Sequence, residues 1–455
     1  MRERQFHASI PGQILDQLRG MSKTSHYRVA YSGGGDSHVL LHLVAGLGDA
    51  LGDATISAVH VNHGLQPNVD QWVHHVSRVC TDLEIACLTL VVDAHPGPGE
   101  SPEAAARRAR YGVMKGIMET NDILLTAHHL DDQAETLLLQ MIRGAGPHGL
   151  AAMPRLVRFG LGWLGRPLLA ISRDALRRYG QSQGLSWVED PSNADDRFDR
   201  NYLRHEILPR LRNRWPGVAA TLGRVAAHQA RTAKRLDQLA KEDLAALQGS
   251  GRHTLSCREL HHLPLERRRN ALHAWFRCLG LPTPNAAHIE RILHDILDAG
   301  PDRMPLVRWR GVEVRRYRDD IHAMAPLPRW GPPVAPIIPW ALAEPLLLSQ
   351  GRLEARPVRG AGLRAASCSD DAVEIRFRQG GERCRTAEGH GHPLKKLFQE
   401  HGVPPWERDR MPLVFVAGEL AAVVGFWVCH PFRTRAHEPG WVFDWTPGGP
   451  DGEGS

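Results

Sequence analysis

Short apolar runs alternate with amphipathic stretches between residues 26 and 190, as expected for strands and helices that take turns along a chain. The first apolar run spans His26 to Tyr31, and apolar residues then recur at helical spacing from Ser37 to Leu47. The same pattern predicts strands at 55–61, 86–92 and 123–127, and helices at 69–83, 102–119 and 131–143. Trp187 and Val188 are expected to end a last strand. The alternation predicts an α/β fold with a doubly wound, mostly parallel sheet.

Beyond this region the pattern becomes helical and basic, from residue 201 to about 247. A Gly-Ser-Gly break at 249–251 ends that stretch, and helices are expected again near 265–279 and 286–297. A helical or mixed middle domain is therefore predicted.

A proline-rich stretch that starts at Pro326 separates the C-terminal part. Short apolar runs at 413–416 and 420–428 predict strands there. We therefore expect a small α+β domain at the C-terminal end. The four expected parts are an α/β domain at 1–214, the middle domain at 215–330, the α+β domain at 340–445 and a disordered tail at 446–455.

The composition is that of a globular protein, with 42% hydrophobic and 23% charged residues. The opening residues lack an apolar signal segment, and no run is long enough to cross a bilayer, so a cytoplasmic location without membrane contact is expected. The net charge is +6, and Lys occurs at only six positions, so arginine supplies most of the cations. This excess suits a polyanionic partner without proving one.

Seven cysteines are scattered along the chain and form no CxxC pair. We expect free buried thiols rather than a disulfide framework or a cysteine-rich zinc site.

A glycine-rich loop joins the first strand to the first helix and consists of Ser32, Gly33, Gly34, Gly35, Asp36 and Ser37. Glycines let the backbone turn sharply and bring N–H groups to an anion, and the following helix directs its positive end to the same place. A carboxylate inside an anion site indicates a bridging cation, so Asp36 predicts Mg²⁺ beside phosphate. No Gly-Lys-Ser/Thr follows, so the loop is not a Walker A motif and instead resembles the PP-loop of ATP pyrophosphatases.

Polar residues also follow the second and fourth strands, at the edge where α/β sheets bind ligands. His60 and Asn62 are candidates for nucleotide contacts. The segment after the fourth strand contains His128 and Asp132 and three candidates for substrate contacts: Asp131, Gln133 and Glu135.

His128 and Asp132 lie four residues apart and can converge once the helix begins. A carboxylate there can hold metal or orient an attacking amine, and a histidine can move protons near neutral pH. Asp36 and Asp132 are the expected metal ligands. Zinc is the competing interpretation of this segment, but the spacing is not that of a zinc protease.

Two further parts of the α/β region supply candidate contacts for the nucleotide or the substrate: an arginine-rich helix and the acidic segment that begins at Glu189. Arg107 and Arg110 share a face of the helix predicted at 102–119, and guanidinium groups suit phosphate or a nucleobase. Substrate contacts are expected from an acid and amide set that precedes Arg204: Glu189, Asp190 and Asn201.

The ordered motifs SGGGDS, HVNHGL, EAAARRARY, AHHLDDQAET, RGAGPHGL, RPLL, WVEDPSN and RNYLR together resemble the tRNA(Ile)-lysidine synthase family. The likeness extends to the C-terminal part through RQGGER at 378–383, LKKLFQE at 394–400 and GVPPW at 402–406. Two positions depart from the family pattern: Gln66 stands where arginine is usual, and His392-Pro393 replaces a more basic segment.

The resemblance implies ATP and Mg²⁺ as cofactors, and free L-lysine and isoleucine tRNA with a CAU anticodon as substrates. ATP would adenylate O2 of the cytidine at the first anticodon position, and lysine would then displace AMP at C2. Asp36, Arg107, His128, Asp132 and Arg204 would be catalytic. Arg383, Lys395 and Lys396 would contact the tRNA in the C-terminal part. The oligomeric state stays open, and a homodimer is compatible with the sequence.

Two alternatives remain open at this point. A related PP-loop enzyme could thiolate a tRNA base, although such enzymes usually carry paired cysteines or iron–sulfur ligands. A tRNA-binding module with a degenerate nucleotide site is the second alternative, and the intact Asp36, His128, Asp131 and Asp132 argue against it.

Overall fold

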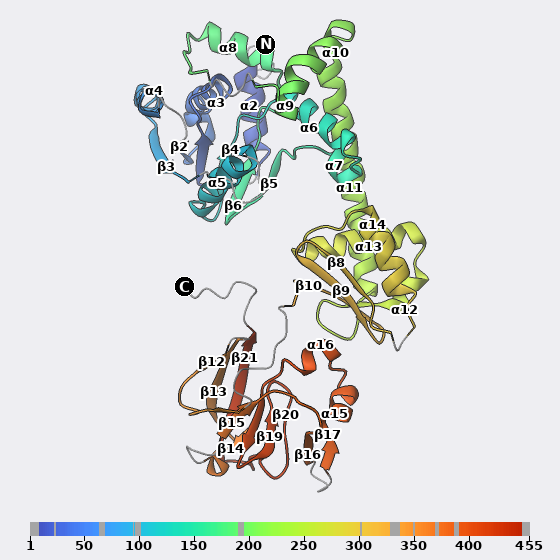
Figure 1. Cartoon of the computed structure of the whole chain (residues 1–455). Coiled ribbons are helices and arrows are strands. Elements are labelled where there is room, and N and C mark those ends of the chain that lie inside the picture. Colours follow the sequence, from blue (N-terminus) through green and yellow to red (C-terminus); the bar gives the residue numbers. More distant parts are fainter. Residues whose placement is uncertain are drawn as a thin grey trace. The chain divides into compact units, whose positions relative to one another are not determined.

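The computed structural model (Figure 1) describes residues 9–21, 24–62, 69–93, 95, 102–189, 195–300, 303–327, 337–348, 351–368, 373–385 and 391–447. The chain divides into two compact units, residues 1–237 and residues 238–455.

A six-stranded sheet organises the first unit. Its strands are β1 (His26–Ala30), β2 (Thr55–Asn62), β3 (Ala86–Val91), β4 (Asp122–Leu125), β5 (Leu156–Phe159) and β6 (Gly162–Gly165), in the order β3-β2-β1-β4-β6-β5. Every neighbouring pair is parallel except β5 and β6. The strands β2 and β3 follow on one side of β1, and the chain then returns to place β4 on the other side of β1. The strand order therefore reverses between β1 and β4. The mostly parallel sheet is confirmed, and the point of reversal is where such sheets bind ligands.

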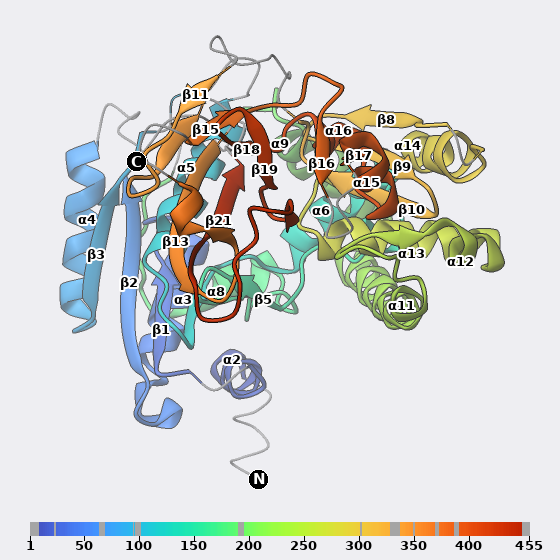
Figure 2. The ribbon, with the colours of Figure 1, turned by 90° about the horizontal axis from the view of Figure 1, so that it is seen from below.

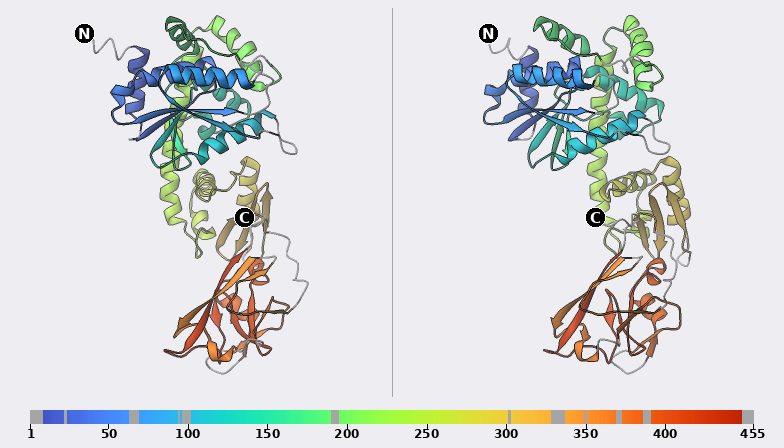
Figure 3. Two further views of the ribbon diagram at one scale, coloured as in Figure 1. Left: turned by 90° about the vertical axis from the view of Figure 1, so that its left-hand side faces the viewer. Right: turned by 60° about the vertical axis from the view of Figure 1, so that its left-hand side comes forward.

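Helices cover both faces of this sheet (Figure 3). Tyr27, Val29 and Leu125 contribute to one core and Leu124 to the other, because successive side chains in a strand point to opposite faces. The helices of the first core are α2 (Ile10–Arg19), α3 (Gly35–Ala45), α4 (Val69–Asp82) and α8 (Arg173–Ser182), and α5 (Pro102–Gly116) packs in the second. A 3₁₀ turn, η1 (Gly48–Leu51), follows α3.

A helical group lies beside the sheet. Ala134, Leu208 and Ala219 join its helices in a small core. The group consists of α6 (Leu130–Ile142), α7 (Pro147–Leu150), α9 (Asp199–Tyr202), the π-helical turn η3 (Leu203–Ile207), α10 (Leu208–Arg214) and the long helix α11 (Val218–Ala246).

The second unit begins with a helical layer on a four-stranded antiparallel sheet of order β7-β10-β9-β8. One core, with Trp275, Phe276 and Val314 among its members, joins the two layers. The elements are β7 (Leu255–Ser256), α12 (Cys257–His262), α13 (Leu265–Cys278), α14 (Ala286–Arg291), the π-helical turn η4 (Ile292–Leu297), β8 (Leu306–Trp309), β9 (Val312–Tyr317) and β10 (Asp320–Met324).

Antiparallel sheets with two short helices complete the second unit (Figure 2), which confirms the α+β prediction. The sheets have the orders β11-β15-β18-β19-β20, β12-β13-β21-β14 and β16-β17. Their strands are β11 (Ile338–Pro339), β12 (Leu346–Leu348), β13 (Gly351–Arg359), β14 (Leu363–Arg364), β15 (Val373–Arg376), β16 (Arg383–Arg385), β17 (Gly391–Pro393), β18 (Leu413–Val416), β19 (Glu419–Val423), β20 (Trp427–Val428) and β21 (Pro439–Pro447). The helical elements are η5 (Ala365–Ser367), α15 (Leu394–Glu400) and α16 (Pro405–Arg408).

Two local predictions were wrong. Trp187 and Val188 form no strand, because the Val188 N–H donates to Gly33 O (3.1 Å) and the segment pairs with the glycine loop instead of the sheet. Cys384 and Cys429 form a disulfide, where free thiols were expected, because folding brings β16 beside the residue that follows β20 within one core.

The tail predicted at 446–455 overlaps the last strand by two residues. Thr446 and Pro447 belong to β21, and residues 448–455 lie outside the described part of the chain. Within the described residues, no helix combines the length and the apolar character that crossing a membrane requires.

A buried ion pair anchors β4 to β1 and yields a stability prediction. Arg28 Nε donates to Asp122 Oδ2 (2.7 Å), the carboxylate side chain is 3% exposed, and the same oxygen accepts from Glu119 N (3.1 Å). Asp122→Ala should destabilise the protein by on the order of 3 kcal/mol in urea unfolding, because it leaves a part-buried guanidinium unpaired.

Glu119→Ala is the control. The Glu119 side chain is 80% exposed and lies 3.9 Å from Arg28, so its loss should change stability by less than about 0.5 kcal/mol. Equal effects of the two substitutions would contradict the role given to the buried pair.

Candidate active site

A cleft of about 970 Å³ opens where the strand order reverses. Its walls include the loop after β1, the end of β2 and the segment after β4. Of the residues predicted from sequence to bind nucleotide or substrate, ten line it: Ser32, Gly34, Gly35, Asp36, Ser37, His60, Asn62, His128, Glu189 and Arg204. The parallel sheet therefore brings segments far apart in sequence to one edge.

The glycine loop ends in the first turn of α3. Gly34 is the N-cap and Gly33 has a φ of +85°, a backbone conformation that side chains disfavour. Ser37 Oγ donates to Gly34 O (2.8 Å) and lies 3.0 Å from Ser32 Oγ, which closes the loop on itself. The helix leaves its first N–H groups without intrahelical acceptors, so they are available to an anion in the cleft.

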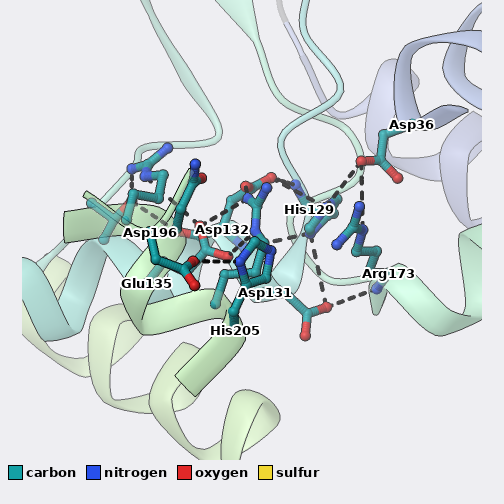
Figure 4. A network of polar contacts seen from close by, with 12 residues as sticks. Asp36, His129, Asp131, Asp132, Glu135, Arg173, Asp196 and His205 are labelled. Carbon is teal, nitrogen blue, oxygen red and sulfur yellow. Dashed lines mark hydrogen bonds and ion pairs between the residues drawn. The ribbon is translucent and has the colours of Figure 1, made fainter. Parts of the chain in front are cut away.

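His129 links this loop to the segment after β4. It is the N-cap of α6, where its Nδ1 accepts from Asp132 N while Asp132 Oδ2 accepts from His129 N (3.0 Å). Its Nε2 lies 3.4 Å from both Asp36 Oδ2 and Asp132 Oδ2, as Figure 4 shows. A single buried imidazole thus contacts a carboxylate from each of the two segments.

Asp132 and Glu135 hold Arg204 at the cleft. Arg204 donates to Glu135 Oε1 (2.7 Å) and Oε2 (3.0 Å) and to Asp132 Oδ1 (3.0 Å). Glu135 is only 1% exposed and also lies 3.7 Å from Arg200, so it positions arginine rather than facing the cleft. Arg204 comes from the π-helical turn η3, an irregularity that is frequent at functional sites.

Electrostatics keep Asp132 ionised. Burial alone would raise the pKa of its carboxyl, but the imidazoles of His129 and His128, the His129 N–H and the Arg204 guanidinium outweigh burial and lower it. Arg204, which lines the cleft, is therefore paired with two carboxylates, those of Glu135 and Asp132.

Asp131 has a separate set of partners. Its Oδ2 accepts from Arg173 N (2.7 Å) at the start of α8, and its Oδ1 accepts from Arg212 of α10. The Arg173 side chain also reaches Asp36, with Nε 4.0 Å from Oδ2. Asp131 thus joins α6, α8 and α10 around the cleft, and its oxygens already have partners.

His128 lies at the cleft with its Nδ1 2.9 Å from Thr126 Oγ1. Burial lowers the pKa of this imidazole to about 4, Asp132 opposes the shift, and nearby arginines add to it. His128 is therefore neutral near neutral pH and able to accept a proton.

The two expected metal ligands differ in their availability. Asp36 faces the cleft, and its side chain is 37% exposed. Both oxygens of Asp132 already accept hydrogen bonds, one from Arg204 and one from His129 N. Asp36 thus fits a cation held between carboxylate and phosphate, whereas Asp132 fits one poorly. Among the described residues, no group of three or more His, Cys, Asp or Glu side chains is arranged so that it could hold a metal ion.

Several other predicted residues lie away from the cleft or outside the described chain. The Gln133 amide bonds Met153 N and O, and Asn201 donates to Asp195 O. Arg107 stacks on the Tyr111 ring, 4.8 Å from its centroid, while Arg110 and Tyr111 line the cleft. Arg383, Lys395 and Lys396 are exposed in the second unit, and Asp190 and Gln66 lie outside the described residues.

Sequence reasoning missed residues that reach the site through the fold. They include His129, which contacts Asp36 and Asp132, and the two tryptophans beside the loop, Trp72 and Trp187. Arg173 and Arg212, which pair with Asp36 and Asp131, were also not predicted. His129 adjoins the predicted His128, and the exact end of β4 decides which of the two meets Asp36. The arginines lie 42 and 81 residues beyond Asp131, so no local pattern signals their contact with it.

Comparison with known proteins agrees with the geometry. The chain matches three family models: a PP-loop domain at residues 7–211, a TilS substrate binding domain at 255–322 and a TilS substrate C-terminal domain at 373–445. A tRNA(Ile)-lysidine synthase of Coxiella burnetii is 40% identical over 96% of this chain and 97% of the relative. The corresponding synthase of Methylococcus capsulatus is 43% identical over 95% of this chain and 99% of the relative.

These matches run through both units and leave no large part of either chain unaligned. The chain therefore belongs to the tRNA(Ile)-lysidine synthase family.

Proposed function

We propose that this chain uses ATP to ligate free L-lysine to C2 of the cytidine at the first anticodon position of a CAU-anticodon isoleucine tRNA. The products are lysidine, AMP and pyrophosphate. One observation supports this function above the rest: the glycine loop after β1 and the histidine–aspartate segment after β4 meet in one cleft, in a member of this family. A cytoplasmic location follows from the substrates.

The reaction has two displacements. First, O2 of the cytidine attacks the α-phosphorus of ATP, the α–β bond breaks and pyrophosphate leaves. Second, the neutral ε-amine of lysine attacks C2, the C2–O bond breaks and AMP leaves with that oxygen. The amine nitrogen loses its proton in this step. An anticodon base lies in a single-stranded loop, so it can enter a protein cleft with little loss of stacking.

The residues around the cleft suit these steps. The N–H groups of the loop and of the first turn of α3 receive the diphosphate. Arg204, held by Glu135 and Asp132, offers a fixed guanidinium to the negative charge that develops on the α-phosphate. A Mg²⁺ ion held by Asp36 would neutralise phosphate charge when bound.

His128 is the proposed proton acceptor for the lysine amine. It is neutral in the free protein, because burial lowers its pKa to about 4. Phosphate anions that enter the cleft favour the imidazolium and raise that pKa again. His128 therefore becomes a better base when the nucleotide is present.

Glu189 is the proposed contact for the lysine amine when lysine binds in its protonated form, before the amine loses its proton and attacks. It lines the cleft and is exposed, and within the described residues no basic side chain pairs with it. Asp131 and Glu135, by contrast, already pair with arginine. The tRNA contacts are assigned to the basic helix α11 and to Arg383, Lys395 and Lys396.

The two alternatives lose support. None of the five free cysteines lines the cleft, so thiolation has no candidate sulfur carrier there. The glycine loop carries Asp36, and His129 contacts both Asp36 and Asp132. These contacts do not favour a degenerate nucleotide site.

Asp36→Asn tests the proposed reaction. With Mg-ATP, lysine and the tRNA, it should lower pyrophosphate release and lysidine formation by roughly 100-fold or more, because the cation loses its carboxylate. Its affinity for tRNA should be unchanged in a filter-binding assay. Near-normal turnover would contradict the role of Asp36.

Glu189→Gln tests the lysine contact. It should raise the KM for lysine by about tenfold and leave the KM for ATP unchanged, because one charge-assisted hydrogen bond to the amine is weakened. Glu206→Gln, which changes a carboxylate paired with Arg210, is the matched control. Equal lysine KM values for the two variants would remove Glu189 from the proposed site.

The exposed lysines of α15 test the tRNA surface. Replacing Lys395 and Lys396 with Ala should weaken tRNA binding by about tenfold and make its salt dependence shallower, because phosphate contacts are lost. The KM for ATP should not change, and Lys115→Ala provides a control at an exposed lysine of α5. An unaltered salt dependence would place the tRNA elsewhere.

A further inference from the structure

The first three carbonyl groups of the glycine loop, those of Ser32, Gly33 and Gly34, have donors within the protein. Ser32 O accepts from the indole Nε1 of Trp72 (2.6 Å), and Gly33 O accepts from Val188 N (3.1 Å). Gly34 O accepts from Ser37 Oγ (2.8 Å) and from His38 N (2.9 Å). These three acceptors are therefore occupied, while the first-turn N–H groups of α3 have no acceptor within the helix.

Trp72 supports the loop from α4. Besides its hydrogen bond to Ser32, its ring lies so close to Gly33 that a Cβ there would stand 2.5 Å from Nε1. The Trp72 N–H thus holds the carbonyl of the peptide unit between Ser32 and Gly33, next to a glycine with a φ of +85°.

Trp187 supports the loop from a segment that follows α8, far from the loop in sequence. A Cβ on Gly35 would stand 3.1 Å from its ring, and the same ring lies 3.3 Å from a Cβ placed on Gly180 of α8. Trp187 thus fills the space between α3 and α8, and this packing places Val188 N against Gly33 O. The segment predicted to be a strand, Trp187 and Val188, therefore packs against the loop and holds Gly33 O by a hydrogen bond.

We propose that Trp72 and the Trp187–Val188 segment are positioning residues that hold the loop carbonyls away from the departing diphosphate. This inference rests on the proposed function, because it gives the loop pyrophosphate as its ligand. A carbonyl oxygen turned toward a phosphate would repel it, and a peptide unit without its donor can rotate in that direction. Trp72 and the Trp187–Val188 segment thus keep the N–H groups of the loop, rather than its carbonyl groups, facing the anion.

Trp72→Phe isolates the hydrogen bond, because it keeps most of the ring and deletes the N–H donor. Calorimetric titration of the full-length protein with inorganic pyrophosphate and Mg²⁺ should show about a tenfold loss of affinity. AMP lacks the diphosphate and should bind both proteins equally, within about twofold. In turnover, the KM for ATP should rise while kcat and the KM for lysine stay unchanged.

Trp163→Phe is the matched control. Trp163 lies in β6 of the same sheet, and its ring packs under Arg158 rather than on the loop. It should leave pyrophosphate binding unchanged, and thermal unfolding of both variants should match the wild-type protein.

Equal pyrophosphate affinity in Trp72→Phe and the wild-type protein would overturn the proposal, as would an equal loss of AMP affinity. A wild-type protein that binds pyrophosphate yet makes no lysidine would instead refute the proposed function and leave the role of Trp72 standing.

Discussion

The contact of His129 with Asp36 and Asp132 depends on one topological constraint, the reversal of strand order between β1 and β4. Two segments that are about ninety residues apart end at the same edge of the sheet because β1 and β4 are parallel neighbours. One segment supplies donors for an anion and the other supplies ionisable groups. The buried imidazole of His129 contacts a carboxylate of each segment, so both segments are needed to form the site.

Charge balance explains why so many acids and arginines surround this contact. Burying a carboxylate is unfavourable unless it is paired, and each buried acid of α6 meets guanidinium or backbone donors. The pairing orders the arginines that come from η3 and α10. The buried acids thus position the arginines, whereas Asp36 and Glu189 line the cleft and are the proposed ligands of the cation and the lysine amine.

The sequence predicted most of the sheet and the place of the cleft, because β1 to β4 are apolar runs separated by helices with clear periodicity. It did not predict the hairpin of β5 and β6, whose strands are only four residues long and include an exposed Arg158. Trp187 was misread because an apolar residue that packs on a loop looks the same as one that packs in a sheet. The partners of Asp131 come from α8 and α10, and only the tertiary fold brings them together.

In the proposed reaction, the glycine loop receives pyrophosphate while the cytidine oxygen captures the adenylate. The most direct test of this reaction is a turnover experiment with isoleucine tRNA that carries ¹⁸O at O2 of the anticodon cytidine. The proposed reaction predicts that lysidine forms and that the ¹⁸O label appears in AMP, because the C2–O bond breaks when lysine attacks. Unlabelled AMP, or release of ADP in place of AMP and pyrophosphate, would contradict it.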